Sequence, residues 1–473
     1  MTDMQSHTDN NYRIYYDRAT AKLALKKYDE AIENYNKSIE LNPDDERSYR
    51  ERSYRFLGIA FFEKGDPDRA IECYNKSIKL KPDNPDTFYL FGNAYLAKGE
   101  IDIALEYLNK SIKLYPHNSH AYNSRGDAYI QKGENDLAIK DYTKAIELRY
   151  NNTKALRNRA TIYIMREEAD LALDDLNKAI ELRPELAELY NDRGQAQKLK
   201  GKLDHAIEDY TKAIDLNPDY TEAYNNRGVV YVEKEEYDLA ITDFGTAIEI
   251  EPDNINAYNY RANVYTKKEE YKLAFKDFDK AIELAPGNAI LYNNRGTAYK
   301  FKGEFDRAIK DYDKAIELNP NLALPYYNRG NTLGLKGELD ASLQEFTKAT
   351  ELDPFYANAY GSRGQVYEEI GQLDLALNDY TKAIELKPDY FEHYNKRGGV
   401  YHRLYEFDRA IKDYTEAIKL HPNYAYPHIN RARAYEKIGD LTNALVDITL
   451  SMEKYPKSPQ TYFIRGILHL RIK

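Results

Sequence analysis

The sequence predicts an all-α protein built from tandem helix-turn-helix repeats, stacked as a solenoid rather than folded around one globular core. Three observations support this class. A period of 34 residues recurs through the 473-residue chain, apolar residues within each period recur three, four and seven apart, and glycine and proline interrupt each period at fixed places. The apolar spacing is that of one helical face, and a fixed period indicates an array whose repeats pack on their neighbours.

The repeat is clearest in residues 221–254, and its positions are counted from the first residue of each repeat. The marker residues of this repeat are Tyr224, Gly228, Tyr231, Ala240, Phe244, Ala247 and Pro252. The next 34 residues place Tyr258, Ala262, Tyr265, Ala274, Phe278, Ala281 and Pro286 at the same positions.

Taken in order, residues 1–11 are polar and are predicted to form a flexible N-terminal tail. Thirteen repeats are predicted within 12–458: the first is 12–45, and the others start every 34 residues from 51. The sequence ERSYR occurs twice in succession, so residues 46–50 are an insertion. Residues 459–473 supply the first half of a further repeat, and one terminal helix is expected there.

Each repeat is predicted to be a short antiparallel helix pair. Position 15 is glycine in eight repeats, which suits the left-handed residue that follows a helix C-terminus. Position 32 is proline in twelve of the thirteen repeats, Tyr150 being the exception, and it ends the second helix. Small residues at positions 8 and 20 let the two helices approach closely, and tyrosines at positions 4 and 11 are expected to fill the space around them.

These residues resemble the tetratricopeptide repeat family, thirteen times in phase along the chain. The resemblance implies a right-handed superhelix of helix pairs that continues beyond one turn. It also implies that the first helices line a concave groove for peptides or proteins, mainly through positions 2, 5, 9, 12 and 13.

Position 7 departs from the family, in which leucine is common, because it is arginine in repeats four to thirteen. Position 23 is acidic in the same ten repeats, as in Arg227 with Asp243, and repeats two and three lose both charges together. Both positions lie equally far from the turn, so we expect a partly buried ion pair within each of these repeats. The alternative is an arginine ladder that clamps acidic ligands.

Asparagine recurs at groove position 5, and its amide both donates and accepts hydrogen bonds. A row of such amides can bind a peptide backbone without reading its side chains, and it resembles the asparagine-lined groove of the repeat domain of O-GlcNAc transferases. The peptide-binding candidates are Asn123, Asn191, Asn225, Asn259, Asn263, Asn293, Tyr327 and Asn395. The alternative for the asparagines is a structural role, as caps or bridges near helix starts.

The carboxylate clamp of chaperone-binding family members needs Lys and Asn in one repeat, Asn in the next, and Lys and Arg in the third. Asn263 followed by Asn294 fits the middle of this pattern. However, Asn259 replaces the leading cation, and the third repeat offers Leu324 and Asn328. We therefore do not expect capture of a chaperone's C-terminal tail.

Composition restricts the function classes further. The net charge of -10 opposes a nucleic-acid partner or an anionic membrane surface. No apolar run reaches the length of a membrane span and the start lacks a signal peptide, so a cytoplasmic protein is expected. Cys73 is the only cysteine, the nine histidines are scattered, and no phosphate-binding glycine loop or nucleophile motif occurs. We expect no active site, metal or cofactor.

The ERSYR duplication carries a basic cluster whose role has two explanations. Its members are Arg47, Arg50, Arg52 and Arg55. The cluster either recognises an acidic partner or, as we favour, pairs with nearby carboxylates on an extended helix. Those carboxylates are Asp44, Asp45, Glu46 and Glu51.

The sequence favours a non-enzymatic protein-interaction scaffold that binds an extended peptide or a partner protein in its groove. An alternative is the regulatory or substrate-recruiting repeat region of a larger enzyme, such as a glycosyltransferase or kinase, because Lys473 ends the chain inside a repeat. RNA binding by helical repeats is a third class, which the charge balance opposes. Self-association through the terminal repeats is a further hypothesis, because an uncapped end exposes apolar surface.

Overall fold

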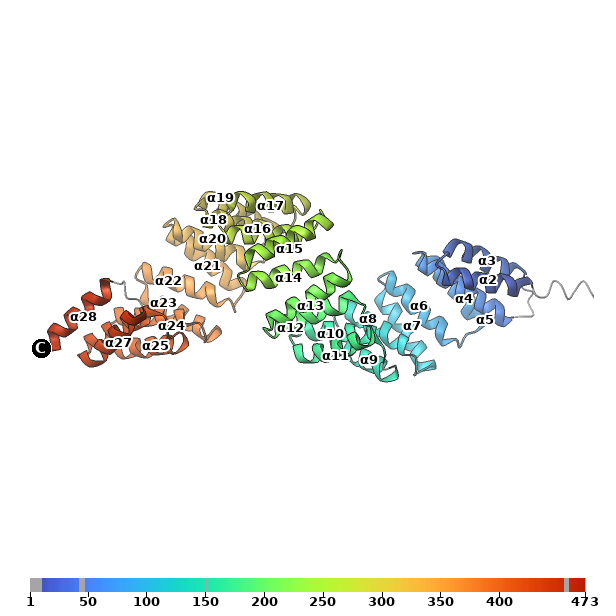
Figure 1. Cartoon of the computed structure of the whole chain (residues 1–473), viewed down its shortest axis with the longest axis horizontal. Helices are drawn as coiled ribbons and strands as arrows, with labels where there is room; N and C mark the ends of the chain where they lie inside the picture. The colour runs from blue at the N-terminus through green and yellow to red at the C-terminus, as the bar shows by residue number, and fades with distance from the viewer. Residues whose placement is uncertain (1–10, 42–46, 150, 455–458, 473) are drawn as a thin grey trace, which may run out of the picture. The chain divides into compact units, whose positions relative to one another are not determined.

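The computed structural model describes residues 11–41, 47–149, 151–454 and 459–472. These residues form 27 α-helices and no β-strand, so the predicted all-α class of tandem helix pairs is confirmed (Figure 1). The chain divides into two compact units, residues 1–239 and 240–473, and helix α15 (Tyr237–Ile250) contains the division.

The first unit consists mainly of six and a half helix pairs. Its helices are α2 (Asn11–Ala24), α3 (Tyr28–Leu41), α4 (Arg47–Glu63), α5 (Pro67–Leu80), α6 (Pro85–Ala97), α7 (Ile101–Leu114), α8 (Ser119–Gln131), α9 (Asn135–Leu148), α10 (Thr153–Met165), α11 (Ala169–Leu182), α12 (Ala187–Leu199), α13 (Leu203–Leu216) and α14 (Thr221–Glu233).

The second unit repeats the same arrangement and ends on a single helix. Its helices after α15 are α16 (Ile255–Lys267), α17 (Tyr271–Leu284), α18 (Ala289–Phe301), α19 (Phe305–Leu318), α20 (Ala323–Leu335), α21 (Leu339–Leu352), α22 (Ala357–Glu369), α23 (Leu373–Leu386), α24 (Phe391–Arg403), α25 (Phe407–Leu420), α26 (Ala425–Lys437), α27 (Leu441–Lys454) and α28 (Pro459–Ile472).

Helix lengths follow the repeat with one exception. The first helix of a pair has 13 residues from α6 to α26, and the second has 14, as in α18 and α19. Helix α4 has 17 residues because the ERSYR duplication lengthens its N-terminal end. Residues 1–10 of the predicted tail, and Asp44, Asp45 and Glu46 of the predicted acidic partners, lie outside the described residues.

The turn inside each pair has the backbone that its residues predict. All eight glycines at position 15 have positive φ, from 70° at Gly201 to 90° at Gly65. The bonds of a helix C-terminal motif close this turn: in one repeat the Gly303 N–H donates to the Lys300 carbonyl at 3.0 Å, and the Glu304 N–H to the Tyr299 carbonyl at 2.9 Å. Tyr405 adopts the same left-handed conformation, with φ of 62°.

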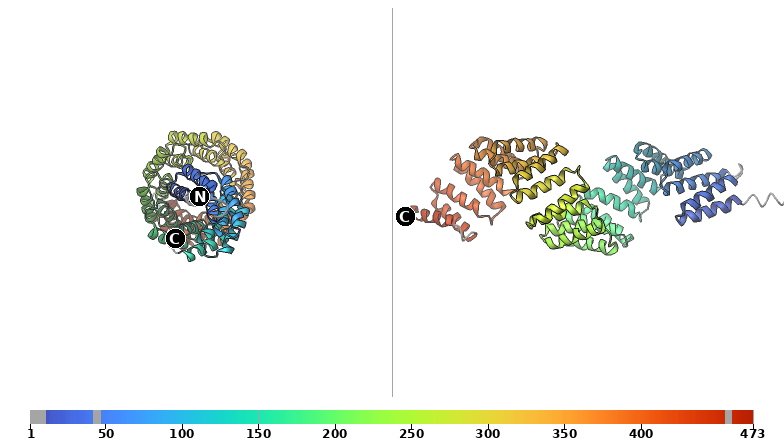
Figure 2. Two further views of the ribbon diagram at one scale, coloured as in Figure 1. Left: turned by 90° about the vertical axis from the view of Figure 1, so that its right-hand side faces the viewer. Right: turned by 90° about the horizontal axis from the view of Figure 1, so that it is seen from above.

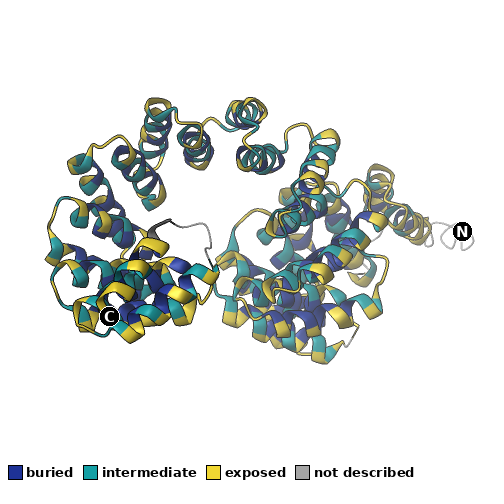
Figure 3. Ribbon diagram, turned by 60° about the vertical axis from the view of Figure 1, so that its left-hand side comes forward, coloured by how far each residue is buried: buried dark blue, intermediate teal, exposed yellow. Residues whose placement is uncertain are grey.

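In seven repeats the interior of the pair is an aromatic ring packed on a glycine. A Cβ added to Gly296 would lie 2.8 Å from a ring carbon of Tyr312, which is fully buried. This ring belongs to position 24. The tyrosines at positions 4 and 11 are mostly half-buried and lie beside the position-7 arginines. For example, the Arg295 guanidinium lies 5.6 Å from the centre of the Tyr292 ring. The space beside the small residues is therefore filled mainly from the second helix. Figure 3 shows the buried residues on the helix faces that contact neighbouring helices.

The predicted arginine–carboxylate pair is confirmed in nine repeats. In the repeat of Arg295, Nε donates to Asp311 Oδ2 at 2.8 Å and Nη2 to Oδ1 at 2.7 Å, while Nη1 donates to Asp279 of the preceding repeat at 2.7 Å. The nine pairs are Arg125–Asp141, Arg159–Asp175, Arg193–Asp209, Arg261–Asp277, Arg295–Asp311, Arg329–Glu345, Arg363–Asp379, Arg397–Asp413 and Arg431–Asp447. Arg227 and Asp243 belong to different units, and their pairing stays a prediction.

These ion pairs join the two helices of a repeat, and the third arginine nitrogen often reaches the repeat before it. The carboxylates are the more buried partners, with side-chain exposures of 2% for Asp447 and 5% for Asp277. Because the guanidinium groups are bound to carboxylates in a two-bond geometry, the arginines have little capacity left for an acidic ligand. The geometry favours the structural explanation over the ligand-clamping ladder.

The terminal helix α28 packs as the first helix of a repeat does. Its Ile464 and Leu468 are buried in one apolar cluster with Ile429 and Ile448. Its other side is open, with Phe463 70% exposed. Figure 2 shows from two further sides that the helices of each pair lie along one another.

Candidate binding pocket

Most of the asparagines predicted to bind a peptide lie inside the stack. Asn123, Asn191, Asn225 and Asn293 are buried, with Asn191 fully inaccessible. Asn259, Asn263, Tyr327 and Asn395 are half-buried.

Many of these amides are bonded across the interface between repeats. The Asn328 amide nitrogen donates to the Asn293 oxygen at 2.8 Å, from position 6 of one repeat to position 5 of the one before. The same bond joins Asn226 to Asn191 at 3.0 Å, Asn294 to Asn259 at 3.0 Å and Asn430 to Asn395 at 3.1 Å. Asn123 donates instead to the helix-capping Asn152 at 3.0 Å. The asparagine row therefore holds neighbouring first helices together, and peptide binding by it stays a prediction.

The basic cluster of helix α4 is partly neutralised within the chain. Glu51 is buried and accepts hydrogen bonds from Ser77 at 2.9 Å and Asn84 at 2.8 Å. Arg55 Nε lies 3.3 Å from the same carboxylate, and its Nη1 lies 3.6 Å from Asp86. The favoured pairing with Glu51 is thus confirmed for Arg55.

A cavity of about 850 Å³ lies among helices α18 to α22 of the second unit. We call it the Gly334 pocket. Its walls are Lys300, Phe301, Gly303, Phe305, Tyr327, Gly330, Asn331, Gly334, Leu335, Leu339, Ser342, Phe346, Ser362, Gln365, Val366 and Glu369. Of the eight predicted site residues, only Tyr327 lies in it. The first-helix residues of the lining include positions 5, 9, 12 and 13, which the family resemblance assigned to the groove.

The pocket has a cause in the sequence. Position 12 is glycine only at Gly334 among the thirteen repeats, and the adjacent repeats have Lys300 and Glu368 there. A glycine inside a helix is destabilising relative to alanine by roughly 0.5–1 kcal/mol. Packing does not require a glycine at position 334, because an added Cβ would contact only the Ser342 Oγ, at the ordinary distance of 3.4 Å. The missing side chain therefore opens space rather than allowing close packing.

The pocket surface combines apolar and polar groups in similar amounts. Phe301 and Leu335 are each 64% exposed. The Tyr327 ring lies 5.9 Å from the buried Phe346 ring and 4.9 Å from Tyr356. Asn331, Ser362 and Gln365 supply uncharged donors and acceptors on the same lining. Aromatic side chains beside convergent polar groups in one cavity are features that ligand sites share.

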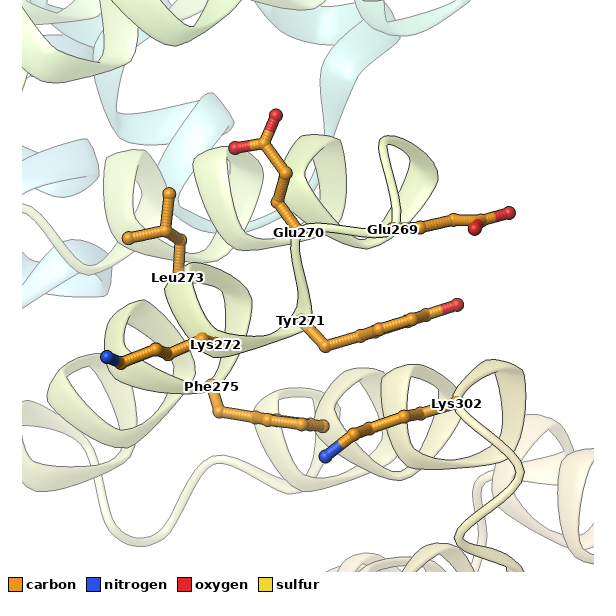
Figure 4. A pocket seen from close by; sticks show the side chains of 7 residues that line it. All are labelled: Glu269, Glu270, Tyr271, Lys272, Leu273, Phe275 and Lys302. Atoms are coloured by element: carbon orange, nitrogen blue, oxygen red, sulfur yellow. The ribbon is translucent and has the colours of Figure 1, made fainter.

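A second pocket of about 630 Å³ lies at the turns between α16 and α17 and at the end of α18 (Figure 4). A cation at position 14 elsewhere pairs with Asp at position 18 of the preceding repeat, as in Lys132–Asp102 and Lys336–Asp306, both 3.0 Å. Lys272 replaces that aspartate here, and Figure 4 shows the Lys302 ammonium group beside the Phe275 ring, whose centre lies 5.5 Å from Nζ. Lys302 binds Glu304 at 2.6 Å instead, so its charge is satisfied within the chain.

The part of the chain that the structure describes contains no group of three or more His, Cys, Asp or Glu side chains arranged to hold a metal ion. Cys73 is buried, and burial raises the pKa of its thiol to about 11, which keeps it protonated and unreactive. None of the helices in the described ranges has both the length and the apolar character that crossing a bilayer requires.

Comparisons with protein families match repeat models along most of the chain. Models described as tetratricopeptide repeat match residues 12–45, 89–149, 125–187, 255–288, 289–322, 311–344, 345–378 and 403–459. A model described as TPR repeat matches residues 58–99, 198–234, 230–268 and 364–404.

Solved structures with a similar fold include three from different proteins. A crystal structure of the APC/C hetero-tetramer Cut9–Hcn1 is 16% identical with a TM-score of 0.46, covering 98% of this chain and 98% of that one. Yeast Tom70 is 19% identical with a TM-score of 0.46, covering 90% of this chain and 97% of its own. The MamA protein is 28% identical with a TM-score of 0.33, covering 36% of this chain and 92% of its own. The comparison with curated proteins gives no match.

Proposed function

Because the chain belongs to the tetratricopeptide repeat family, we propose that it is a protein-interaction scaffold that holds an extended segment of a partner protein in the Gly334 pocket. The observation that supports this most is the lone glycine at position 12, which opens a pocket with apolar and polar walls at positions that the family uses for its groove. Side chains exposed on rigid helices need little ordering on binding, so modest contacts suffice for affinity.

Photo-crosslinking from inside and outside the pocket tests this proposal. Phe301 would be replaced by p-benzoylphenylalanine, which keeps the ring in the pocket wall. Phe355, 80% exposed and absent from the pocket lining, is the matched control with the same residue type. After irradiation in lysate of the producing cells, we expect partner adducts from position 301 that position 355 does not give, identified by mass spectrometry.

A third variant connects the adducts to the pocket itself. Gly334→Leu fills the cavity with a side chain of ordinary helical character, and we expect it to abolish the adducts from position 301. Identical adducts from both crosslinker positions, or adducts unchanged by Gly334→Leu, would contradict the proposal.

Three sequence predictions stay open beside this one. Hydrogen bonding of a peptide backbone by the asparagine positions would be seen as loss of partners when Asn225, Asn259 and Asn293 are changed to Ala. Self-association through the terminal repeats would be seen in sedimentation as a mass that rises with concentration. A cytoplasmic location awaits imaging of the tagged chain.

A further inference from the structure

Three ion pairs join adjacent first helices of the stack at one pair of positions. In each of them, position 12 of one repeat and position 13 of the next have opposite charges. Lys198 pairs with Glu233 at 3.0 Å, and the reversed pair joins Glu436 to Arg471 at 2.7 Å. Arg403 approaches Glu368 in the same way at 3.6 Å.

The Gly334 pocket has only one charged member of such a pair at each of two successive interfaces. Lys300 occupies position 12, but position 13 of the next repeat is Leu335. Glu369 occupies position 13, but position 12 of the preceding repeat is Gly334 itself. Neither Lys300 nor Glu369 forms an ion pair with any residue that the structure describes, and both line the same cavity.

Lys300 is the more constrained of the two charges. It is half-buried, and its one close charge interaction is with the Phe301 ring, whose centre lies 5.0 Å from Nζ. Burial lowers the pKa of its ammonium group, because no carboxylate compensates for the lost hydration. A ligand carboxylate at this place would restore the interaction that Glu233 gives to Lys198.

We propose that the Gly334 pocket selects partner segments by a charge pattern: an acidic side chain at Lys300, an apolar side chain over Gly334, and a basic side chain at Glu369. This inference rests on the proposed function and names the chemistry of the segment that the pocket holds. The two charges stand on α18 and α22, with α20 between them. At about 8–10 Å between packed helices and about 3.3 Å per extended residue, two helix steps correspond to roughly six residues of peptide.

Labelled peptides of seven residues test the pattern against the full-length chain. The matched probe is fluorescein-Asp-Ser-Gly-Phe-Gly-Ser-Lys, and its controls have Asp at both ends, Lys at both ends, or Ser in place of Phe. Fluorescence polarisation should give the tightest binding for the matched probe, by about twofold to fivefold for each correct charge, as expected of ion pairs at an open site. The Ser control should bind weakest.

Charge-reversal variants then predict a change of preference rather than a simple loss. Lys300→Glu should make the peptide with Lys at both ends the preferred probe, and Glu369→Lys should do the same for the peptide with Asp at both ends. Glu369 is exposed and Lys300 is half-buried at the wall of an open pocket, so we expect both variants to fold, and circular dichroism serves as the folding control.

The outcomes separate this inference from the proposed function. Equal affinity for all three charge forms, with binding lost in Gly334→Leu, would overturn the charge pattern while supporting the pocket. Variants that leave the order of the probes unchanged would overturn it as well. If no probe binds the wild-type chain, the pattern is wrong, and the crosslinking experiment decides the proposed function separately.

Discussion

The asparagine row and the Gly334 pocket occupy similar positions on the first helices but differ in whether their polar groups already have partners. In the row, Asn328 donates to Asn293 and Asn226 donates to Asn191, so amides of one repeat satisfy those of the next. In the pocket, Lys300 has no carboxylate partner among the described residues. Polar residues that occupy the same position in many repeats mostly bond to the neighbouring repeat. A ligand site is better sought at a position where one repeat differs from the others.

Removing a charged side chain that has an ion-pair partner should lower the unfolding free energy far more than removing one that has none. Asp311→Ala leaves the half-buried Arg295 without its main partner, and we expect a loss of about 3 kcal/mol in unfolding free energy. Lys300→Ala, on the neighbouring turn of the same first helix, should change stability by less than about 0.5 kcal/mol. Urea unfolding followed by circular dichroism measures both, and hydrogen exchange in α18 and α19 localises the effect.

The double variant Arg295→Leu with Asp311→Leu is the control for that comparison. Removing both charges should recover much of the lost stability, because no uncompensated charge remains. Equal losses from Asp311→Ala and Lys300→Ala would contradict the distinction between paired and unpaired charges.

Two glycines of α20 sharpen the comparison within a single helix. A Cβ on Gly330 would lie 2.9 Å from a ring carbon of Phe346, so Gly330→Ala should destabilise the chain by about 1–3 kcal/mol. Gly334→Ala meets no such obstacle and should stabilise it by about 0.5–1 kcal/mol through helix propensity. Thermal melting of the two variants shows the opposite signs, and a destabilised Gly334→Ala would mean that this glycine is needed for packing.

Two asparagines, one hydrogen-bonded and one not, should also differ in their contribution to stability, by a smaller amount. Asn293→Ala removes the acceptor of the buried Asn328 amide, and we expect a loss of about 1–2 kcal/mol in unfolding free energy. Asn263 forms no side-chain hydrogen bond with a described residue, so Asn263→Ala should be neutral in stability. If Asn263→Ala weakens partner binding in the crosslinking assay, the predicted role of the asparagines in the groove gains support.

The smallest expected effect is a pH dependence at His393. Its ring is buried in the space above Gly361, and burial lowers its pKa below the usual 6.5, with Glu392 opposing and Lys387 adding to the shift. The unfolded chain therefore binds the proton more readily, so stability should fall as pH drops below about 6.5, with a slope of at most about 1.4 kcal/mol per pH unit.

His393→Leu is the matched control for this dependence, since Leu291 occupies the same position three repeats earlier. The variant should flatten the stability profile between neutral pH and pH 5. An unchanged profile would assign any acid destabilisation to another group.

The period of the sequence was sufficient to predict most of the architecture. Glycine at position 15 predicted the turn, and charges that occur together at positions 7 and 23 predicted the ion pair, because each depends only on residues within one repeat. The Gly334 pocket was not predicted, although its signal is present as a glycine where every other repeat has a side chain. The asparagines recur at one position, which predicted a shared role. Their bonds to the neighbouring repeat were not predicted, because these depend on how one repeat packs on the next.

Three kinds of side-chain bond that recur between these helices have a constant separation along the chain. The arginine–carboxylate pair spans 16 residues, the bridge between turns spans 30, and the asparagine bond spans 35. Duplicating or deleting a complete 34-residue segment would leave all three separations intact, so the same bonds would form again on either side of the change. The stack can therefore gain or lose complete repeats without any new kind of contact. The five-residue duplication near the start of the chain, in contrast, only extended one helix.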